Sequence, residues 1–190
     1  MTVGKLITKK GKRKESNAPV LNILEATVRI NSAEYTALGT VITKDDGSTF
    51  TIESPRIHCE MEVLDTGPRD KKHIGTTWWE NLYYPETKKG SEEYENRPGT
   101  KLGNLTTALY GEEFWSVDGA YLNPDDLNSF EFVSSLEPRK KFGSNEITGT
   151  QVNHKHISTA PDHKPPTIPV ELSEEDEADM QAGLGESDDR

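Results

Sequence analysis

The stretch HIGTTWWENLYYP, from His73 to Pro85, holds two Trp, two Tyr and one Leu in a chain that is only 7% aromatic. Alternation sorts its side chains into two rows: Thr77, Trp79, Asn81 and Tyr83 in one, and Trp78, Glu80, Leu82 and Tyr84 in the other. Successive side chains of a β-strand point to opposite faces, so the pattern predicts a strand with rings on both faces. One row must therefore lie away from the core, or beneath a loop or a partner.

The segments before this strand predict two more main strands and a hairpin. RIHCEMEVLDTG, residues 56–67, alternates cleanly and points one set of residues inward: Ile57, Cys59, Met61 and Val63. APVLNILEATVRI, residues 18–30, predicts a half-buried strand with this inward row: Val20, Leu24, Ala26, Val28 and Ile30. Between these strands, two β-branched runs flank Asp45-Asp46-Gly47, and Asp-Gly is a strong hairpin signal.

The segments after the aromatic strand predict a helix and two final strands. TKLGNLTTALYG, residues 100–111, has Leu at helical spacing, with Thr100 as the N-cap and Gly111 at the end. SFEFVSSLEP and SNEITGTQV then predict two strands around the basic turn RKKFG. The order of elements predicts an all-β fold with one short helix, the five-stranded Greek-key barrel of the OB-fold with an inserted hairpin.

Charge is unevenly distributed along the 190 residues, whose formal net charge is -11. Residues 1–17 carry six Lys and Arg against one acid, whereas residues 171–190 carry nine acids against one base. With a low apolar fraction of 32%, these ends predict disorder outside a single domain. We expect a basic flexible arm at 1–18, the OB-fold domain at 19–157, a Pro-rich linker at 158–170 and an acidic disordered tail at 171–190.

Compartment and chemistry follow mostly from what the sequence lacks. The one cysteine, Cys59, cannot form an internal disulfide, and neither a signal peptide nor a bilayer-spanning run is recognisable, so we expect a cytoplasmic protein without a membrane partner. Neither a phosphate-binding Gly loop nor a nucleophile elbow is present, so we expect no enzyme, no catalytic residue and no cofactor. His154 and His156 lack a third ligand in the same element, so no metal site is expected.

From about Val20 to Asn153 the chain resembles the OB-fold single-stranded DNA-binding proteins encoded by bacteriophages, as a divergent member. The pieces that carry the resemblance occur in the order EVLD, GTTWWENLYY, KLGNLTTAL, NPDDL, FEFV and PRKKFGSNEI. The resemblance implies an accessory protein of replication or recombination, acting in the cytoplasm of the bacterial host, whose acidic tail engages replication or recombination proteins. The tail ends GESDDR, without the terminal aromatic residue of the best-known version. A homodimer is also compatible with this class.

The expected binding residues combine aromatic rings, on which nucleobases stack, with basic side chains that contact phosphates. Glu80 in the other row would repel phosphates, which favours Trp79 and Tyr83 as the binding row. In an OB-fold the loop between the last two strands forms one wall of the groove. The predicted nucleic-acid-binding residues are Trp79, Tyr83, Arg56, His58, Arg29, Lys71, Lys72, Arg139, Lys140, Lys141 and Phe142.

Two alternatives remain open from the residues alone. All four rings of the aromatic strand could cover the core and the hairpin. The chain could instead be an acidic adaptor that binds a replication or host protein through the aromatic strand or the tail. A negative net charge does not exclude nucleic-acid binding, because a polyanionic tail can act as an intramolecular competitor for a basic groove.

Overall fold

The chain folds into mainly β-structure with one α-helix. The computed structural model describes residues 18–44, 46–91, 93–141 and 143–171, so nearly all of the basic arm and of the acidic tail lies outside it. The elements are β1 (Ile23–Thr36), β2 (Val41–Thr43), β3 (Thr49–Thr51), β4 (Arg56–Thr66), η1 (Lys71–His73), β5 (Thr77–Tyr83), α1 (Lys101–Tyr110), η2 (Glu112–Ser116), η3 (Pro124–Leu127), β6 (Glu131–Lys140), β7 (Ile147–Val152), η4 (His154–His156) and β8 (Ser158–Thr159).

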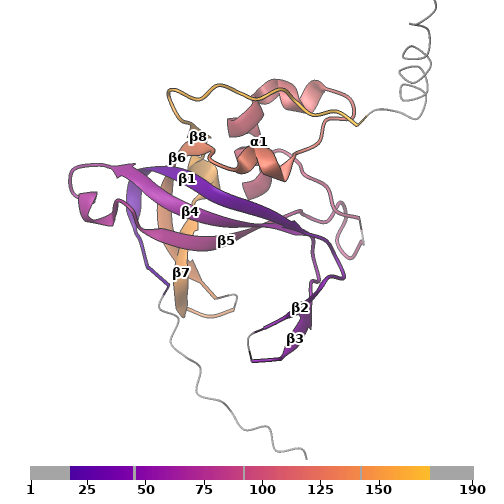
Figure 1. Cartoon of the computed structure of the whole chain (residues 1–190), viewed down its shortest axis with the longest axis horizontal. Coiled ribbons are helices and arrows are strands. Elements are labelled where there is room, and N and C mark those ends of the chain that lie inside the picture. Colours follow the sequence, from indigo (N-terminus) through magenta and orange to yellow (C-terminus); the bar gives the residue numbers. More distant parts are fainter. Residues whose placement is uncertain (1–17, 45, 92, 142, 172–190) are drawn as a thin grey trace, which may run out of the picture.

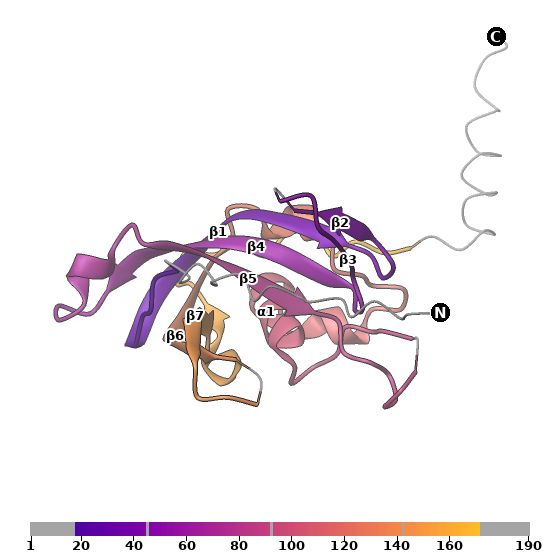
Figure 2. The ribbon, with the colours of Figure 1, turned by 90° about the horizontal axis from the view of Figure 1, so that it is seen from below.

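One antiparallel sheet forms the body of the protein. Its strand order is β5-β4-β1-β6-β7, with β8 added beside β6 and β2–β3 forming a separate hairpin. Strand β1 is central because it pairs with β6 from Ile23 to Arg29 and with β4 from Ala26 to Thr36. Figure 2 shows β1, β4 and β5 as an arch with α1 on its concave side. This order, with the helix between β5 and β6, confirms the predicted all-β, OB-like fold with an inserted hairpin. The five-stranded sheet is curled into a half-barrel (Figure 2).

The inward rows of β4 and β5 and the leucines of α1 form the core as predicted. The buried residues include Ile57, Cys59, Met61, Val63, Trp78, Leu82, Leu102, Leu105 and Leu109. Burial raises the pKa of the Cys59 thiol to about 12, and the nearby Glu80 carboxylate acts in the same direction. Cys59 is therefore an uncharged core side chain at neutral pH.

The start of β1 differs from the prediction. Leu21 and Ile23 are buried, whereas Val20 and Leu24 are exposed, Leu24 by 92%. Three residue steps from Ile23 to Ala26 on β1 face only two steps on β6, from Leu136 to Ser134, which makes a β-bulge. A bulge reverses the alternation on one side of it, so the predicted inward row is correct only after the bulge.

Helix α1 begins and ends where the sequence indicates. The Thr100 hydroxyl oxygen accepts a hydrogen bond from the Gly103 N–H at 3.0 Å, and Gly111 follows the last turn with a φ of 95°. Gly103 inside the helix is explained by packing, because a Cβ there would lie 1.9 Å from the Arg97 carbonyl oxygen. Figure 1 shows α1 on one side of the sheet and the β2–β3 hairpin projecting on the other.

Glu80 joins the two edges of the sheet. Its side chain is 3% exposed, and one carboxylate oxygen accepts from the Val152 N–H of β7 at 3.0 Å and from the Trp78 indole N–H at 3.3 Å. The other oxygen accepts from the Lys101 ammonium at the start of α1 at 2.5 Å. A charged residue in the inner row of β5 therefore has the partners that its burial requires.

The segment expected to be a Pro-rich linker is extended and lies against the domain. Its first residues form β8, and the His163 Nε2 donates to the Leu109 carbonyl at 2.7 Å. Further along, Val170 pairs with Ala120 in a β-bridge, and the Glu171 N–H donates to the Gly119 carbonyl at 3.0 Å. Figure 1 shows this segment, in orange to yellow, passing over the helices. Contacts with the domain thus continue to Glu171.

The Glu80 contacts predict a large and specific effect on stability. Glu80→Ala should lower the free energy of unfolding by about 3–5 kcal/mol, because the Lys101 ammonium and the Val152 N–H lose their acceptor. Glu60→Ala, on the outer row of neighbouring β4, is the matched control and should change it by no more than about 0.5 kcal/mol. Urea denaturation of both variants measures the difference. Equal midpoints would show that the edges of the sheet close without the carboxylate.

Candidate nucleic-acid interface

The aromatic strand presents one row of rings to solvent. Trp79 and Tyr83 are 50% and 51% exposed, whereas the adjacent Trp78 is 4% exposed. Trp79 and Tyr83 therefore form the outward row of the strand, as predicted, and Trp78 belongs to the core. Their place on one face of β5, four residues apart, puts these rings about 13 Å apart along an ideal strand.

His58 on β4 lies against Trp79. The two rings stack with centroids 4.5 Å apart and planes within 8° of parallel. The His58 Nδ1 donates to the Asn81 side-chain oxygen at 2.8 Å, because a carbonyl oxygen can only accept. This hydrogen bond and the stack hold both rings in position, so the exposed side of Trp79 is preorganised for a flat ligand.

The cross-strand register sets a gradient of charge along this face. From Thr77 to Tyr83 the facing residues of β4 are, in order, Glu62, Glu60, His58 and Arg56. Two glutamates thus lie beside the start of β5, and the basic Arg56 lies beside its end. Arg56 is half-buried, and its Nε has no hydrogen-bond partner within the described residues. We call Arg56, His58, Trp79 and Tyr83 the ring patch.

The other predicted basic side chains lie away from the ring patch. Arg29 on β1 forms an ion pair with Glu131 at 3.1 Å, opposite the acidic end of β4. Lys71 and Lys72 are exposed on η1, in the loop that precedes β5. Figure 1 shows this loop at the far left, well away from the β6–β7 hairpin.

The basic turn between β6 and β7 forms its own local contacts. Arg139 donates to the hydroxyl and the carbonyl of Thr148 across the hairpin, each at 3.4 Å. Lys140 is exposed at the end of β6, and Lys141 lies 3.5 Å from the Glu146 carboxylate. Phe142 lies outside the described residues. The structure thus gives this turn no described contact with the ring patch.

A hollow of about 420 Å³ extends the ring patch beyond Tyr83. Its lining includes Tyr84, Tyr94, Lys89 and Arg97, with Glu86 as its one acid. Lys89 and Arg97 were not among the predicted binding residues. The only available signal was the position of KK and R in a loop that directly follows the aromatic strand.

The described residues contain neither a metal-binding cluster nor a membrane-spanning helix, and no known family matches the chain. Within the described residues, no group of three His, Cys, Asp or Glu side chains could hold a metal ion. In the same residues no helix is long and apolar enough to span a bilayer. No protein-family model, curated protein or solved structure matches the chain.

Truncation of the two adjacent tryptophans should lower stability by very different amounts. Trp78→Ala should lower the free energy of unfolding by about 3–5 kcal/mol, because it leaves a cavity beside Glu80. Trp79→Ala should lower it by less than about 1.5 kcal/mol, because half of that side chain is already in water. Thermal or urea unfolding of both variants tests the assignment. Similar losses would mean that Trp79 also belongs to the core.

Proposed function

We propose that this chain binds single-stranded nucleic acid, and single-stranded DNA in particular, through the ring patch and the hollow beside it. The observation that carries the proposal is the outward row of β5, where Trp79 and Tyr83 are half-exposed on a sheet whose opposite face is the core. Stacking of a base on an aromatic ring contributes about 1–3 kcal/mol and tolerates any sequence. The spacing of the two rings suits contacts with different bases of one strand.

The charge gradient suggests where the phosphates lie. Arg56 faces Tyr83, and Lys89 and Arg97 line the hollow that continues from it. Glu60 and Glu62 lie at the other end of the face and would repel a polyanion. The proposed strand of nucleic acid therefore runs from Trp79 over Tyr83 toward Lys89 and Arg97. The resemblance to phage proteins adds a proposed role in replication or recombination, with the acidic tail as the segment that engages partner proteins.

A protein-binding adaptor is the second candidate, and the acids on the same face favour it. Glu60 and Glu62 lie beside exposed rings, which fits a protein partner that carries Lys or Arg side chains at the facing positions. The two candidates differ in their response to an oligonucleotide. Only the first predicts stacking of bases on Trp79.

Fluorescence titration with oligo(dT) tests the first candidate. We expect quenching of tryptophan emission at low salt and its loss in Trp79→Phe, whereas Trp115→Phe should retain it. Trp79→Ala should weaken binding by roughly 1–3 kcal/mol. If the full chain shows neither quenching nor a change in anisotropy of labelled oligo(dT) at low salt, the adaptor is favoured.

Salt dependence locates the phosphate contacts. Lys89→Ala combined with Arg97→Ala should flatten the log–log slope of affinity against salt by about 1.4, the value for two lost contacts on a single strand. Replacement of Arg139, Lys140 and Lys141 together should flatten the slope less, because the described contacts of that turn are local. The reverse order would place the path along the β6–β7 hairpin.

A further inference from the structure

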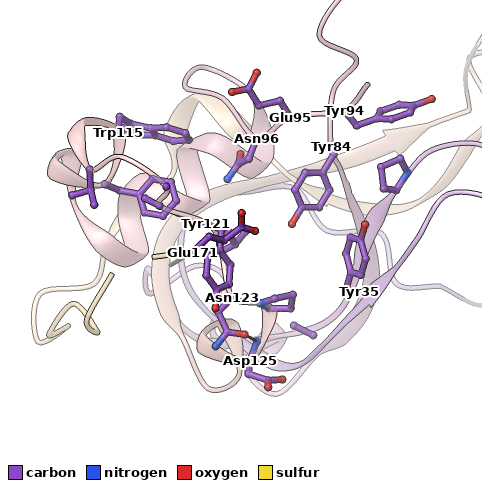
Figure 3. Close-up of a pocket in the computed structure, with 18 of the residues that line it drawn as sticks. Tyr35, Tyr84, Tyr94, Glu95, Asn96, Trp115, Tyr121, Asn123, Asp125 and Glu171 are labelled. Carbon is purple, nitrogen blue, oxygen red and sulfur yellow. Dashed lines mark hydrogen bonds between the residues drawn. The ribbon is translucent and has the colours of Figure 1, made fainter. Parts of the chain in front are cut away.

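A second hollow, of about 1160 Å³, opens at one end of the half-barrel. It lies between the end of β1, the loop after β5, the segment from η2 to η3, and Glu171. Figure 3 shows side chains from these segments surrounding the hollow, with the Tyr84 hydroxyl pointing into it. None of the predicted site residues that the structure describes lines it, so it is distinct from the ring patch.

The lining of this hollow combines aromatic rings with carboxylates. The rings are Tyr35, Tyr84, Tyr94, Phe114, Trp115 and Tyr121. Four acids, Glu34, Glu95, Asp125 and Glu171, come from four separate segments, and the described lining contains no Lys, Arg or His. Faces of aromatic rings and carboxylates both attract cations, so a positively charged ligand fits this surface and a polyanion does not.

A buried acceptor without a partner lies in Asn96, one of the lining residues. The Thr106 hydroxyl donates its one hydrogen to the Leu102 carbonyl at 2.9 Å, so it must accept from the Asn96 side-chain NH2 at 2.8 Å. That contact fixes the orientation of the amide and leaves the buried Asn96 Oδ1 without a partner in the described chain. This oxygen has almost no water-accessible surface, so a ligand could reach it only after the Asn96 side chain moves.

The rings are held in place before any ligand binds. Tyr35 and Tyr84 meet edge to face with centroids 5.9 Å apart, and the Trp115 indole N–H donates to the Thr107 hydroxyl at 2.8 Å. Burial raises the pKa of Tyr84 to about 12, and the neighbouring Tyr35 acts in the same direction. The Tyr84 hydroxyl is therefore neutral at physiological pH and can either donate or accept.

We propose that this cavity is a docking site for a basic peptide of a partner protein, with Arg or Lys side chains inserted between the rings. Its volume exceeds the roughly 300–1,000 Å³ of ordinary small-molecule pockets. The four carboxylates come from separate segments and so suit several cations spaced along an extended chain better than one small cation. The cavity shares Tyr84 and Tyr94 with the hollow beside the ring patch, but this assignment rests on its other rings and its carboxylates.

Anisotropy of a fluorescein-labelled (Gly-Arg)4 peptide, titrated with the full chain, tests the proposal. Glu95→Gln combined with Asp125→Asn should weaken binding about threefold or more, since both carboxylates line the cavity. Glu25→Gln combined with Asp65→Asn removes the same charge at exposed positions of β1 and β4 outside the cavity lining, and should leave the affinity unchanged. Because every variant keeps the acidic tail, equal weakening by the two pairs would show general charge attraction and overturn the proposal.

A charge-neutral pair of variants separates ring contacts from electrostatics. Tyr121→Leu, at a ring 43% exposed in the cavity, should weaken peptide binding, whereas Tyr83→Leu, at a ring 51% exposed on the ring patch, should not. The opposite pattern is expected for oligo(dT), so failure of one site is distinguishable from failure of the other. Argininamide binding as tightly as the peptide, or peptide binding that is indifferent to Tyr121→Leu, would overturn the assignment.

Discussion

The half-barrel depends on the hydrogen bonds that the buried carboxylate of Glu80 accepts. Strands β5 and β7 are the open edges of the sheet, and the Glu80–Val152 hydrogen bond joins them through a side chain. The same carboxylate holds Lys101 at the start of α1, so one residue fixes the closing edge and the position of the helix. A buried carboxylate without such partners would be too costly to keep, which ties the register of β5 to these contacts. A slip of one residue would expose Glu80 and leave Lys101 and the Val152 N–H unpaired.

The register fixed by Glu80 also decides which rings reach solvent. Trp78 and Trp79 are the same residue type at neighbouring positions, yet one is 4% and the other 50% exposed. Composition cannot make that distinction, whereas the need to bury Glu80 beside its partners does. The exposed row is therefore a consequence of the same constraint that closes the sheet. The hydrogen bond from His58 to Asn81 and the stack on Trp79 then fix the outward rings from the neighbouring strand.

Much of the fold could be predicted because its elements obey local rules. Alternation gave the inward row of β4 and both rows of β5, and capping residues gave the ends of α1. The bulge near Ile23 could not be predicted, since the extra residue is defined only by the facing strand β6. The candidate nucleic-acid site could likewise be predicted only where its residues follow a local pattern. Trp79, Tyr83, His58 and Arg56 share one local register, whereas Lys89 and Arg97 join them only through the path of a loop. The second hollow is lined by residues from several separate segments, so no short sequence pattern predicts it.

The net charge of -11 is a poor guide to what each face of this protein attracts. Tyr84 and Tyr94 line both hollows, so the two lie next to each other with opposite character. On one side of these rings are Lys89 and Arg97, and on the other are carboxylates without a base among the described lining residues. Exposed charges farther apart than about 8 Å are largely screened at physiological ionic strength, so a ligand responds mainly to the groups that line its own hollow. The basic residues of the hollow beside the ring patch therefore favour a polyanion as its ligand, whereas the carboxylates of the second hollow favour a polycation.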